Sequence, residues 1–259
     1  MENRTIIITQ ARTGSTRFPR KILEKINQKT LLEIHLQRLK KSRLVNEIIL
    51  ATTTKSEDNI IDEIGQKLGI QVFRGSEENV LSRFWHSVAK KQVDYLVRVT
   101  SDCPLIDPKL IDLMLTDAHD SRVDYLSNTL KETFPDGQDI EIFTKKALKK
   151  AHSSATLNSH KEHVTLYIKE NSDYMDKHMF RAKSYERSID PISEIRMTVD
   201  EREDFEAMKL LIESLGVSKG YLEYSEFYLL NELSKINGKI YRNEGLIKSL
   251  QNEDRERII

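Results

Sequence analysis

The sequence predicts an α/β fold with a mainly parallel sheet and helices on both of its faces. Strand patterns alternate with amphipathic helix patterns from residue 6 to residue 118, which is the chain order of a parallel sheet with crossover helices. No segment approaches the roughly 18 uninterrupted apolar residues of a membrane-spanning helix. Lys and Arg (41) balance Asp and Glu (41), which excludes a basic nucleic-acid binder or an acidic disordered tail as the whole protein.

The first half of the chain alternates regularly. Short β-branched and apolar runs predict strands at residues 6–9, 45–53, 71–73 and 94–100. Apolar side chains at helical spacing predict helices at residues 30–42, 57–68, 77–91 and 108–118. Pro108 suits the first turn of the last helix, and Asp107 is expected to be its N-cap. In such a sheet, ligands bind beyond the carboxyl ends of the strands.

The second half alternates less regularly. Strands are predicted at residues 123–127, 139–143 and 195–199, and helices at residues 144–151, 161–169, 201–215 and 225–235. The single cysteine, Cys103, cannot form an internal disulfide, and the N-terminal apolar run is too short for a secretory signal. We therefore expect a cytoplasmic location and no nucleic-acid or membrane partner.

The loop that follows the first predicted strand is rich in cations and small residues. Residues 10–21 contain four basic side chains together with Gly14, Ser15 and Thr16; the four are Arg12, Arg17, Arg20 and Lys21. Guanidinium groups, hydroxyls and freed backbone N–H groups are what a polyphosphate needs. The alternative is a solvated cationic turn, but the position after the first strand favours a phosphate site. The sequence contains neither a Walker P-loop nor a Rossmann glycine fingerprint.

Two aspartates follow predicted strands in the same way. Asp102 comes just after the strand at 94–100, and Asp200 ends the strand at 195–199. Carboxylates at this edge of a sheet can hold a hard divalent cation that also bridges phosphate oxygens. The alternative for Asp102 is a cap of the turn. The acids that follow Asp200 fit the first turn of a helix, where they suit the helix dipole.

Three further segments carry weaker signals. Gln138, Asp139 and Glu141 surround a turn and a strand, and Asp139 and Glu141 share a face that could hydrogen-bond a polyol. His163 does not belong to a zinc-binding H-E-x-x-H motif, and a surface or packing role is the simpler interpretation. Ser76 is expected to cap the helix at 77–91, and Gly75 would let the backbone approach a ligand closely.

These motifs together resemble the cytidylyltransferases that make CMP-activated acidic sugars, the family of the CMP-Kdo and CMP-sialic acid synthetases. The opening signature is matched by Ala11, Arg12, Gly14, Ser15, Arg17, Pro19 and Lys21. The bacterial spore-coat polysaccharide type is the closer resemblance, because segments 74–84, 97–108, 138–143, 162–165 and 198–204 have counterparts there in the same order. In that type an apolar residue stands at the position of Gln138.

The resemblance implies a nucleotide-diphospho-sugar transferase fold, a Rossmann-like α/β/α sandwich. Residues 1–235 would form one nucleotidyltransferase domain, with an acceptor-binding and homodimer-forming region at about 120–195 and a C-terminal extension at 236–259. It implies CTP as the donor and the small acidic sugar as the acceptor. It also implies that Mg²⁺ is held by Asp102 and Asp200.

The resemblance assigns roles to further residues. Nucleotide binding would involve Ala11, Arg12, Gly14, Ser15, Lys21, Thr52, Thr53, Arg74 and Gly75. The catalytic residues would be Arg12, Arg17, Lys21 and Asp102, and the acceptor would face Gln138, Asp139, Glu141 and His163.

We therefore expect an enzyme that transfers CMP from CTP to a 2-keto-3-deoxy sugar acid for surface polysaccharide synthesis, with release of pyrophosphate. The alternatives are transfer to a phosphorylated polyol or another small phosphate, glycosyl transfer, and a non-catalytic nucleotide-binding module. Glycosyltransferases of this fold place an Asp-x-Asp pair at the strand end, whereas Pro104 stands where the second acid would be.

Overall fold

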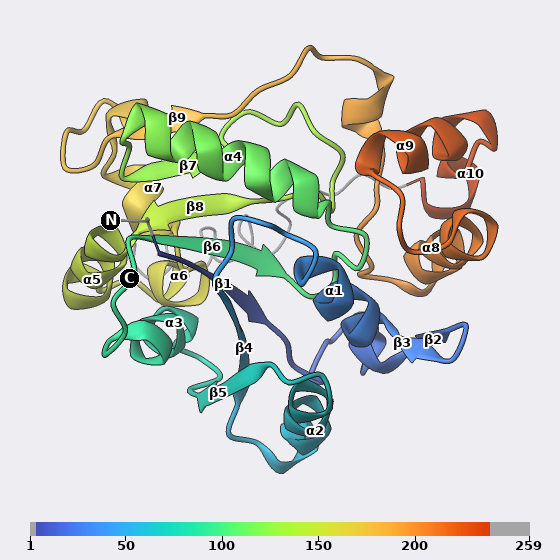
Figure 1. Cartoon of the computed structure of the whole chain (residues 1–259), viewed down its shortest axis with the longest axis horizontal. Coiled ribbons are helices and arrows are strands. Elements are labelled where there is room, and N and C mark those ends of the chain that lie inside the picture. The colour runs from blue at the N-terminus through green and yellow to red at the C-terminus, as the bar shows by residue number, and fades with distance from the viewer. Residues whose placement is uncertain (1–3, 239–259) are drawn as a thin grey trace, which may run out of the picture.

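The central feature of the computed structural model, which describes residues 4–238, is a seven-stranded sheet (Figure 1). Across the sheet the strands are β5 (Gln71–Gly75), β4 (Glu47–Thr53), β1 (Thr5–Gln10), β6 (Tyr95–Thr100), β8 (Glu141–Thr144), β7 (Tyr125–Ser127) and β9 (Ala182–Ser184). The first four run parallel, β8 is antiparallel to β6 and β7, and β9 is parallel to β7. The predicted α/β fold with a mainly parallel sheet is confirmed.

The register of the parallel strands brings two loops together. Gln10, the last residue of β1, pairs with Ala51 of β4 and with Thr100, the last residue of β6. The chain therefore leaves β1 and β6 side by side at one edge of the sheet. This is the edge at which parallel α/β sheets bind ligands.

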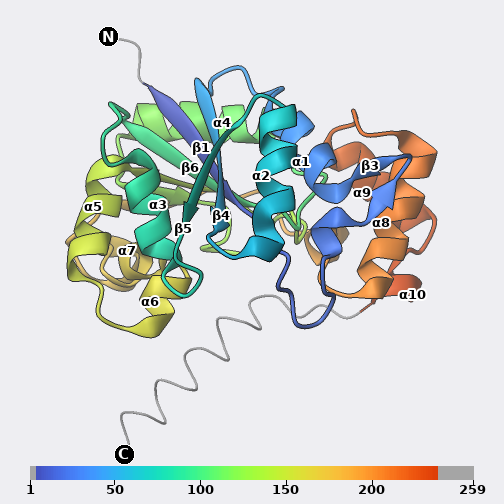
Figure 2. The same cartoon turned by 90° about the horizontal axis from the view of Figure 1, so that it is seen from below.

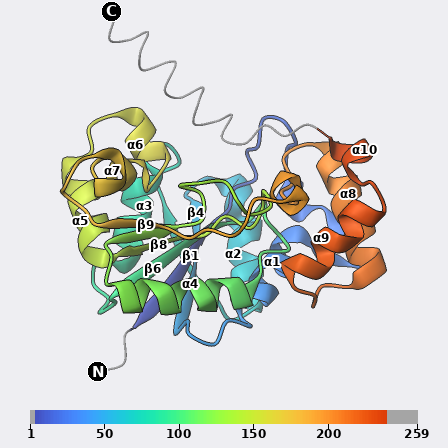
Figure 3. The ribbon, with the colours of Figure 1, turned by 90° about the horizontal axis from the view of Figure 1, so that it is seen from above.

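Helices cover both faces of the sheet (Figures 2 and 3). Phe84 and Leu148 pack with Ile6 and Ile8 on one face, whereas Ile7, between them in β1, packs with α4 on the opposite face. The helices of the first face are α3 (Val80–Val88), α5 (Lys145–Ser154), α6 (Asn158–Glu162) and α7 (Leu166–Glu170). Those of the opposite face are α1 (Leu31–Leu39), α2 (Asn59–Lys67) and α4 (Pro108–Ser121). The alternation within β1 is that of a strand buried on both faces.

A further group of helices lies at one end of the molecule, beside α1 (Figure 1). It consists of α8 (Arg202–Leu215), α9 (Tyr221–Leu230) and α10 (Ser234–Asn237), and the short hairpin of β2 (Lys25–Ile26) and β3 (Lys29–Thr30) lies nearby. No helix within residues 4–238 is long and apolar enough to cross a membrane. Residues 239–259, most of the predicted extension at 236–259, lie outside the described residues.

The predicted strand at 195–199 is wrong. The segment forms one isolated bridge, between Arg196 and Asp136. Its apolar side chains, Ile195, Met197 and Val199, are buried against α8 and α9 rather than in the sheet. The apolar residues that suggested a strand are therefore buried by packing against helices, with only local backbone pairing.

Two helix predictions also need correction. The predicted helix at 161–169 is divided into α6 and α7 by residues 163–165, and the predicted helix at 225–235 is divided into α9 and α10. The helix predicted from Glu77 begins at Val80, and its N-cap is Asn79, whose side chain accepts a hydrogen bond from Ser82. Asp107 caps α4 as predicted.

Candidate functional site

The loop after β1 is held by a buried carboxylate. Asp58 is 2% exposed and accepts hydrogen bonds from the backbone N–H and the hydroxyl of Thr13, both at 2.8 Å. The carbonyl of Thr13 accepts further hydrogen bonds from the backbone N–H groups of Ser15 and Arg20. The backbone of the predicted phosphate loop is therefore fixed by contacts within the protein.

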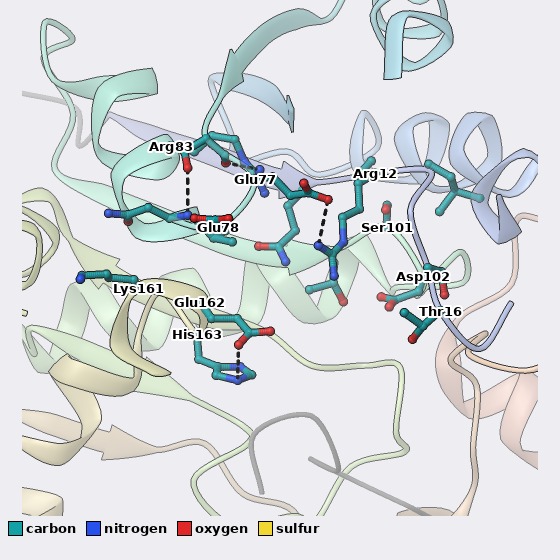
Figure 4. Close-up of a pocket in the computed structure, with 18 of the residues that line it drawn as sticks. Arg12, Thr16, Glu77, Glu78, Arg83, Ser101, Asp102, Lys161, Glu162 and His163 are labelled. Carbon is teal, nitrogen blue, oxygen red and sulfur yellow. Dashed lines mark hydrogen bonds and ion pairs between the residues drawn. The ribbon is translucent and has the colours of Figure 1, made fainter. Parts of the chain in front are cut away.

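A cavity of about 930 Å³ lies against this loop (Figure 4). Eight predicted site residues line it: Ala11, Arg12, Ser15, Arg17, Lys21, Asp102, His163 and Asp200. Other walls come from residues 76–83, which lead into α3, and from α6. In Figure 4, Arg12 and Glu77 lie on one side of the space, while Glu162 and His163 lie on another. Segments distant in sequence thus enclose one cavity at the predicted edge of the sheet.

The two predicted metal-binding aspartates converge on one cation. The Nζ atom of Lys21 lies 3.1 Å from Oδ2 of Asp102 and 2.7 Å from Oδ1 of Asp200. Burial alone would lower the pKa of Lys21, but the two carboxylates outweigh burial and raise it. Burial would raise the pKa of Asp102, but chiefly Lys21 holds it below its usual range. Within residues 4–238, no group of three or more His, Cys, Asp and Glu side chains is placed to bind a metal.

Asp200 is also oriented by a buried arginine. Arg196, whose side chain is 4% exposed, donates hydrogen bonds to Oδ2 of Asp200 at 2.9 Å and to Asp136 and Asp204 at 2.8 Å. Oδ1 of Asp200 faces Lys21 and, at 3.1 Å, Arg17. Arg196 thus holds Oδ2 of Asp200, while Oδ1 of the same carboxylate contacts Lys21.

A second cavity of about 280 Å³ meets the first at the aspartates. Six residues line both cavities: Arg17, Arg98, Thr100, Asp102, His163 and Asp200. The other walls of the second cavity come from residues 125–141, which include Asp139 and Glu141, from residues 165–169 and from residues 196–198. Two compartments of different size therefore share one wall of charged groups.

Glu141 belongs to a buried network in the second cavity. Its carboxylate accepts hydrogen bonds from the guanidinium of Arg98 and from the hydroxyls of Thr165 and Tyr125. Burial would raise the pKa of Glu141, but Arg98 and the two hydroxyls lower it. The network keeps the carboxylate ionised within the cavity wall.

Six predicted site residues, all in the described part of the chain, line neither cavity: Gly14, Thr52, Thr53, Arg74, Gly75 and Gln138. Thr53 donates a hydrogen bond to Asp58, the residue that holds the first loop. The guanidinium of Arg74 donates to Asn59 and to the carbonyls of Thr53 and Lys55. Thr53 and Arg74 thus brace the chain after β4.

Gln138 is fully buried, away from both cavities. Its amide oxygen accepts a hydrogen bond from the backbone N–H of Asp107, and its amide nitrogen donates to the carbonyl of Leu105. These contacts use the side chain to hold the turn at residues 134–138 against the chain after β6.

Five lysines and arginines in the cavity walls were not among the predicted site residues: Arg83, Arg98, Lys161, Lys169 and Arg196. Arg83 is 3% exposed and donates a hydrogen bond to the carbonyl of Ser76, and burial together with Arg12 lowers its pKa to about 10. The sequence could have revealed Arg83, Arg98 and Arg196, because each is a charged residue within an otherwise apolar stretch. Lys161 lies among polar residues and Lys169 follows the apolar run at 166–168 just before Glu170, and neither setting gives such a signal.

Comparisons with known proteins agree with this architecture. The family model described as cytidylyltransferase matches residues 6–240. An uncharacterised protein of Methanocaldococcus jannaschii, MJ1063, is 40% identical over 76% of this chain and 79% of its own length. The spore coat polysaccharide biosynthesis protein SpsF of Bacillus subtilis is 32% identical over 83% of this chain and 88% of its own length.

Solved structures extend the comparison to the fold. A cytidylyltransferase from Leptospira borgpetersenii is 34% identical and superposes with a TM-score of 0.82 over 93% of this chain and 100% of that one. A CMP:2-keto-3-deoxy-manno-octonic acid synthetase, solved with CTP, has a TM-score of 0.59 at 16% identity over 82% of this chain and 99% of that one, which shows the same fold. The resemblance inferred from the motifs is confirmed, and the chain belongs to the cytidylyltransferase family of CTP-dependent nucleotidyltransferases.

Proposed function

We propose that this cytidylyltransferase transfers CMP from CTP to a small acidic sugar of the 2-keto-3-deoxy type and releases pyrophosphate. The observation that carries the proposal is the meeting of two cavities at Asp102 and Asp200. A larger cavity lined by loop cations suits a nucleoside triphosphate, and a smaller one beside it suits a sugar. The likeness to SpsF supports a role in surface polysaccharide synthesis.

The donor would bind in the larger cavity with its triphosphate against the first loop. Arg12, Arg17 and Lys21 line this cavity and supply three positive charges. They would neutralise the β- and γ-phosphates, on which negative charge grows as pyrophosphate leaves. Arg83, which lines the same cavity, adds a cation whose position is fixed by its hydrogen bond to the carbonyl of Ser76.

The aspartate pair fits a magnesium ion. Oxygens from Asp102 and Asp200 already converge on a positive charge, the Nζ atom of Lys21. Mg²⁺ is commonly bound by one or two carboxylates together with substrate phosphates. The metal would supply charge neutralisation at phosphate oxygens. Lys21 would then turn from the carboxylates towards the phosphates of the donor.

The acceptor would bind in the smaller cavity, with Asp139 and His163 in its wall and Glu141 beneath. In the transfer, an acceptor oxygen forms a bond to the α-phosphorus, and the bond from that phosphorus to the bridging β-phosphate oxygen breaks. The acceptor hydroxyl loses its proton to solvent. The contribution of the chain is to hold the two reactants in line across the shared wall. We also propose that two copies of the chain associate as a homodimer, as the resemblance implies.

The test measures pyrophosphate release from CTP and Mg²⁺ in the presence of 3-deoxy-manno-octulosonate. We expect release by the wild type and a loss of at least about 10²-fold in Asp102→Ala, because a group at the reacting phosphate is removed. Asp120→Ala, an exposed aspartate of α4, is the matched control and should keep full activity. Undiminished release by Asp102→Ala would exclude the role given to Asp102, and stronger thermal stabilisation by UTP or GTP would contradict the choice of donor.

A further inference from the structure

Two lysines on neighbouring short helices line different cavities. Lys161 lies on α6 and lines the larger cavity, and Lys169 lies on α7 and lines the smaller one. Within residues 4–238, neither side chain takes part in an ion pair or a hydrogen bond. By contrast, the Lys21 ammonium contacts two carboxylates. Each cavity thus contains one ammonium group whose countercharge the described protein does not supply.

The other strong cations of the smaller cavity already have carboxylate partners. Arg98 pairs with Glu141. Arg196 pairs with Asp136, Asp200 and Asp204. Arg17 pairs with Asp200, leaving Lys169 as the lysine or arginine of this wall, within residues 4–238, that is not committed to a carboxylate. An anionic ligand would supply the countercharge that Lys169 does not receive from the described protein.

The charges of the smaller cavity are also unevenly distributed. Six carboxylates line it, and three of them, Glu132, Asp136 and Asp139, come from the segment between β7 and β8. His163 and Lys169 come from the segment that contains α6 and α7. A ligand with an anionic end and a hydroxylated remainder matches this distribution, because carboxylates accept hydrogen bonds from hydroxyls and repel anions.

We propose that Lys169 binds the anionic group of the acceptor, a carboxylate or a phosphate that lies apart from the reacting oxygen. The inference rests on the proposed function, because it takes the smaller cavity as the acceptor site. An ammonium is a compact charge with three donors and binds either anion. The carboxylates of the segment between β7 and β8 would accept hydrogen bonds from the hydroxyls of the acceptor. Lys169 therefore selects acceptors by charge.

The experiment compares binding in the wild type, Lys169→Met and Lys161→Met by titration calorimetry. The probes are 3-deoxy-manno-octulosonate, glycerol 3-phosphate and uncharged mannose, and CTP with Mg²⁺ is titrated separately. We expect the wild type to bind at least one of the two anions more tightly than mannose. Lys169→Met should weaken that binding about tenfold or more, the value of one charged hydrogen bond, and leave the affinity for CTP unchanged.

Lys161→Met provides the crossed control. It should weaken CTP binding and leave binding of the anionic probe unchanged. Lys109→Met, an exposed lysine of α4, should change neither. The titrations with 3-deoxy-manno-octulosonate and with glycerol 3-phosphate distinguish a carboxylate acceptor from a phosphate acceptor. The preferred anion is the one whose binding Lys169→Met weakens more.

Several results would overturn the proposal. They are the absence of binding of both anions to the wild type, equal binding of mannose, unchanged anion binding in Lys169→Met, or a greater loss of anion binding in Lys161→Met than in Lys169→Met. Failure of the proposed function would look different, since CTP with Mg²⁺ would then not bind to the wild type. An effect of Lys169→Met on folding would appear as a lower melting temperature, and Lys169→Arg should then restore both folding and anion binding.

Discussion

The walls of the two cavities differ in how their charges are held. In the larger cavity two of the loop cations are accessible, since the side chain of Arg12 is 50% exposed and that of Arg17 is 37% exposed, whereas that of Lys21 is only 11% exposed. In the smaller cavity Arg196 and Glu141 are buried, and each makes at least three hydrogen bonds to other parts of the protein. The first set can move to meet a flexible triphosphate, whereas the second set is fixed before an acceptor arrives.

The difference bears on both stability and specificity. An exposed cation costs little to hold and contributes little to folding. A buried charge is stable only with its partners, so its removal leaves the partners unpaired. We therefore expect substitutions in the loop to reduce catalysis and substitutions in the buried networks to reduce stability.

The largest expected effect is at Arg196. Arg196→Met would leave three carboxylates without their shared cation, those of Asp136, Asp200 and Asp204. The free energy of unfolding should fall by about 3–5 kcal/mol, as for other broken buried ion pairs. Urea unfolding measures this change. Arg12→Met in the loop is the matched control and should change stability by less than about 1 kcal/mol, because its pair with Glu77 is exposed. Equal losses in both variants would contradict the comparison.

The next effect concerns catalysis at Lys21. Lys21→Met removes the ammonium between Asp102 and Asp200, and the rate of pyrophosphate release should fall about 10²- to 10³-fold. Without the ammonium the two carboxylates repel each other, so Mg²⁺ should raise the melting temperature more in the variant than in the wild type. Lys25→Met, at an exposed position in β2, is the control for the loss of a nearby charge. A normal rate in Lys21→Met would remove the lysine from the catalytic set.

Substitution of two glycines tests whether the backbone of the loop at residues 10–21 is less tightly packed than that of the turn at residues 134–138. Gly137 has φ of 99°, and a Cβ atom there would lie 2.5 Å from the backbone of Met197. Gly137→Ala should therefore cost roughly 1–3 kcal/mol of unfolding free energy through strain and displacement of the 195–199 segment. At Gly14 the nearest atom to an added Cβ is Oε1 of Glu77, 3.8 Å away. Gly14→Ala should leave the unfolding midpoint almost unchanged, and a loss as large as that of Gly137→Ala would show that the loop is as constrained as the turn.

The contrast between the loop at residues 10–21 and the buried networks of the smaller cavity also explains what could be predicted from the sequence. The loop at residues 10–21 is continuous, so its cations are visible as a cluster, and the strand before it gives its place in the fold. Asp102 follows a strand whose apolar pattern is unmistakable. The convergence of Asp102 and Asp200 was also predicted, although the reason given for Asp200, a strand at 195–199, was wrong.

The smaller cavity was less predictable because its contacts join distant segments. The resemblance assigned Gln138 to the acceptor, yet its side chain is hydrogen-bonded to the backbone of Leu105 and Asp107. Arg74 looked like a ligand-binding residue, but its donors are taken by the chain after β4. Such bonds depend on the packing of loops, which leaves no periodic pattern in the sequence.

The smallest effect that we expect is a pH dependence of stability from His35, which links β1 to the loop after β6. Its Nδ1 donates to the carbonyl of Cys103, 2.9 Å away, so its Nε2 is left to accept from the hydroxyl of Thr9 at 2.8 Å in the neutral ring. Burial lowers the pKa of His35 from 6.5 to about 4, and Arg38 adds to this, while the Cys103 carbonyl and Asp102 oppose it.

Because the folded protein resists protonation of His35, the unfolded chain binds more protons below pH 6.5. Stability should therefore fall as the pH decreases from 7.5 to 5.5, and His35 should account for about 1.3 kcal/mol of that loss. Urea unfolding at the two pH values measures the loss in the wild type and in His35→Gln, whose amide keeps a donor and an acceptor without titrating. The variant should lose less stability than the wild type by that amount. An equal loss in the two proteins would mean that His35 is protonated as easily in the folded state as in the unfolded chain, and that the link between β1 and the loop after β6 does not depend on its neutral ring.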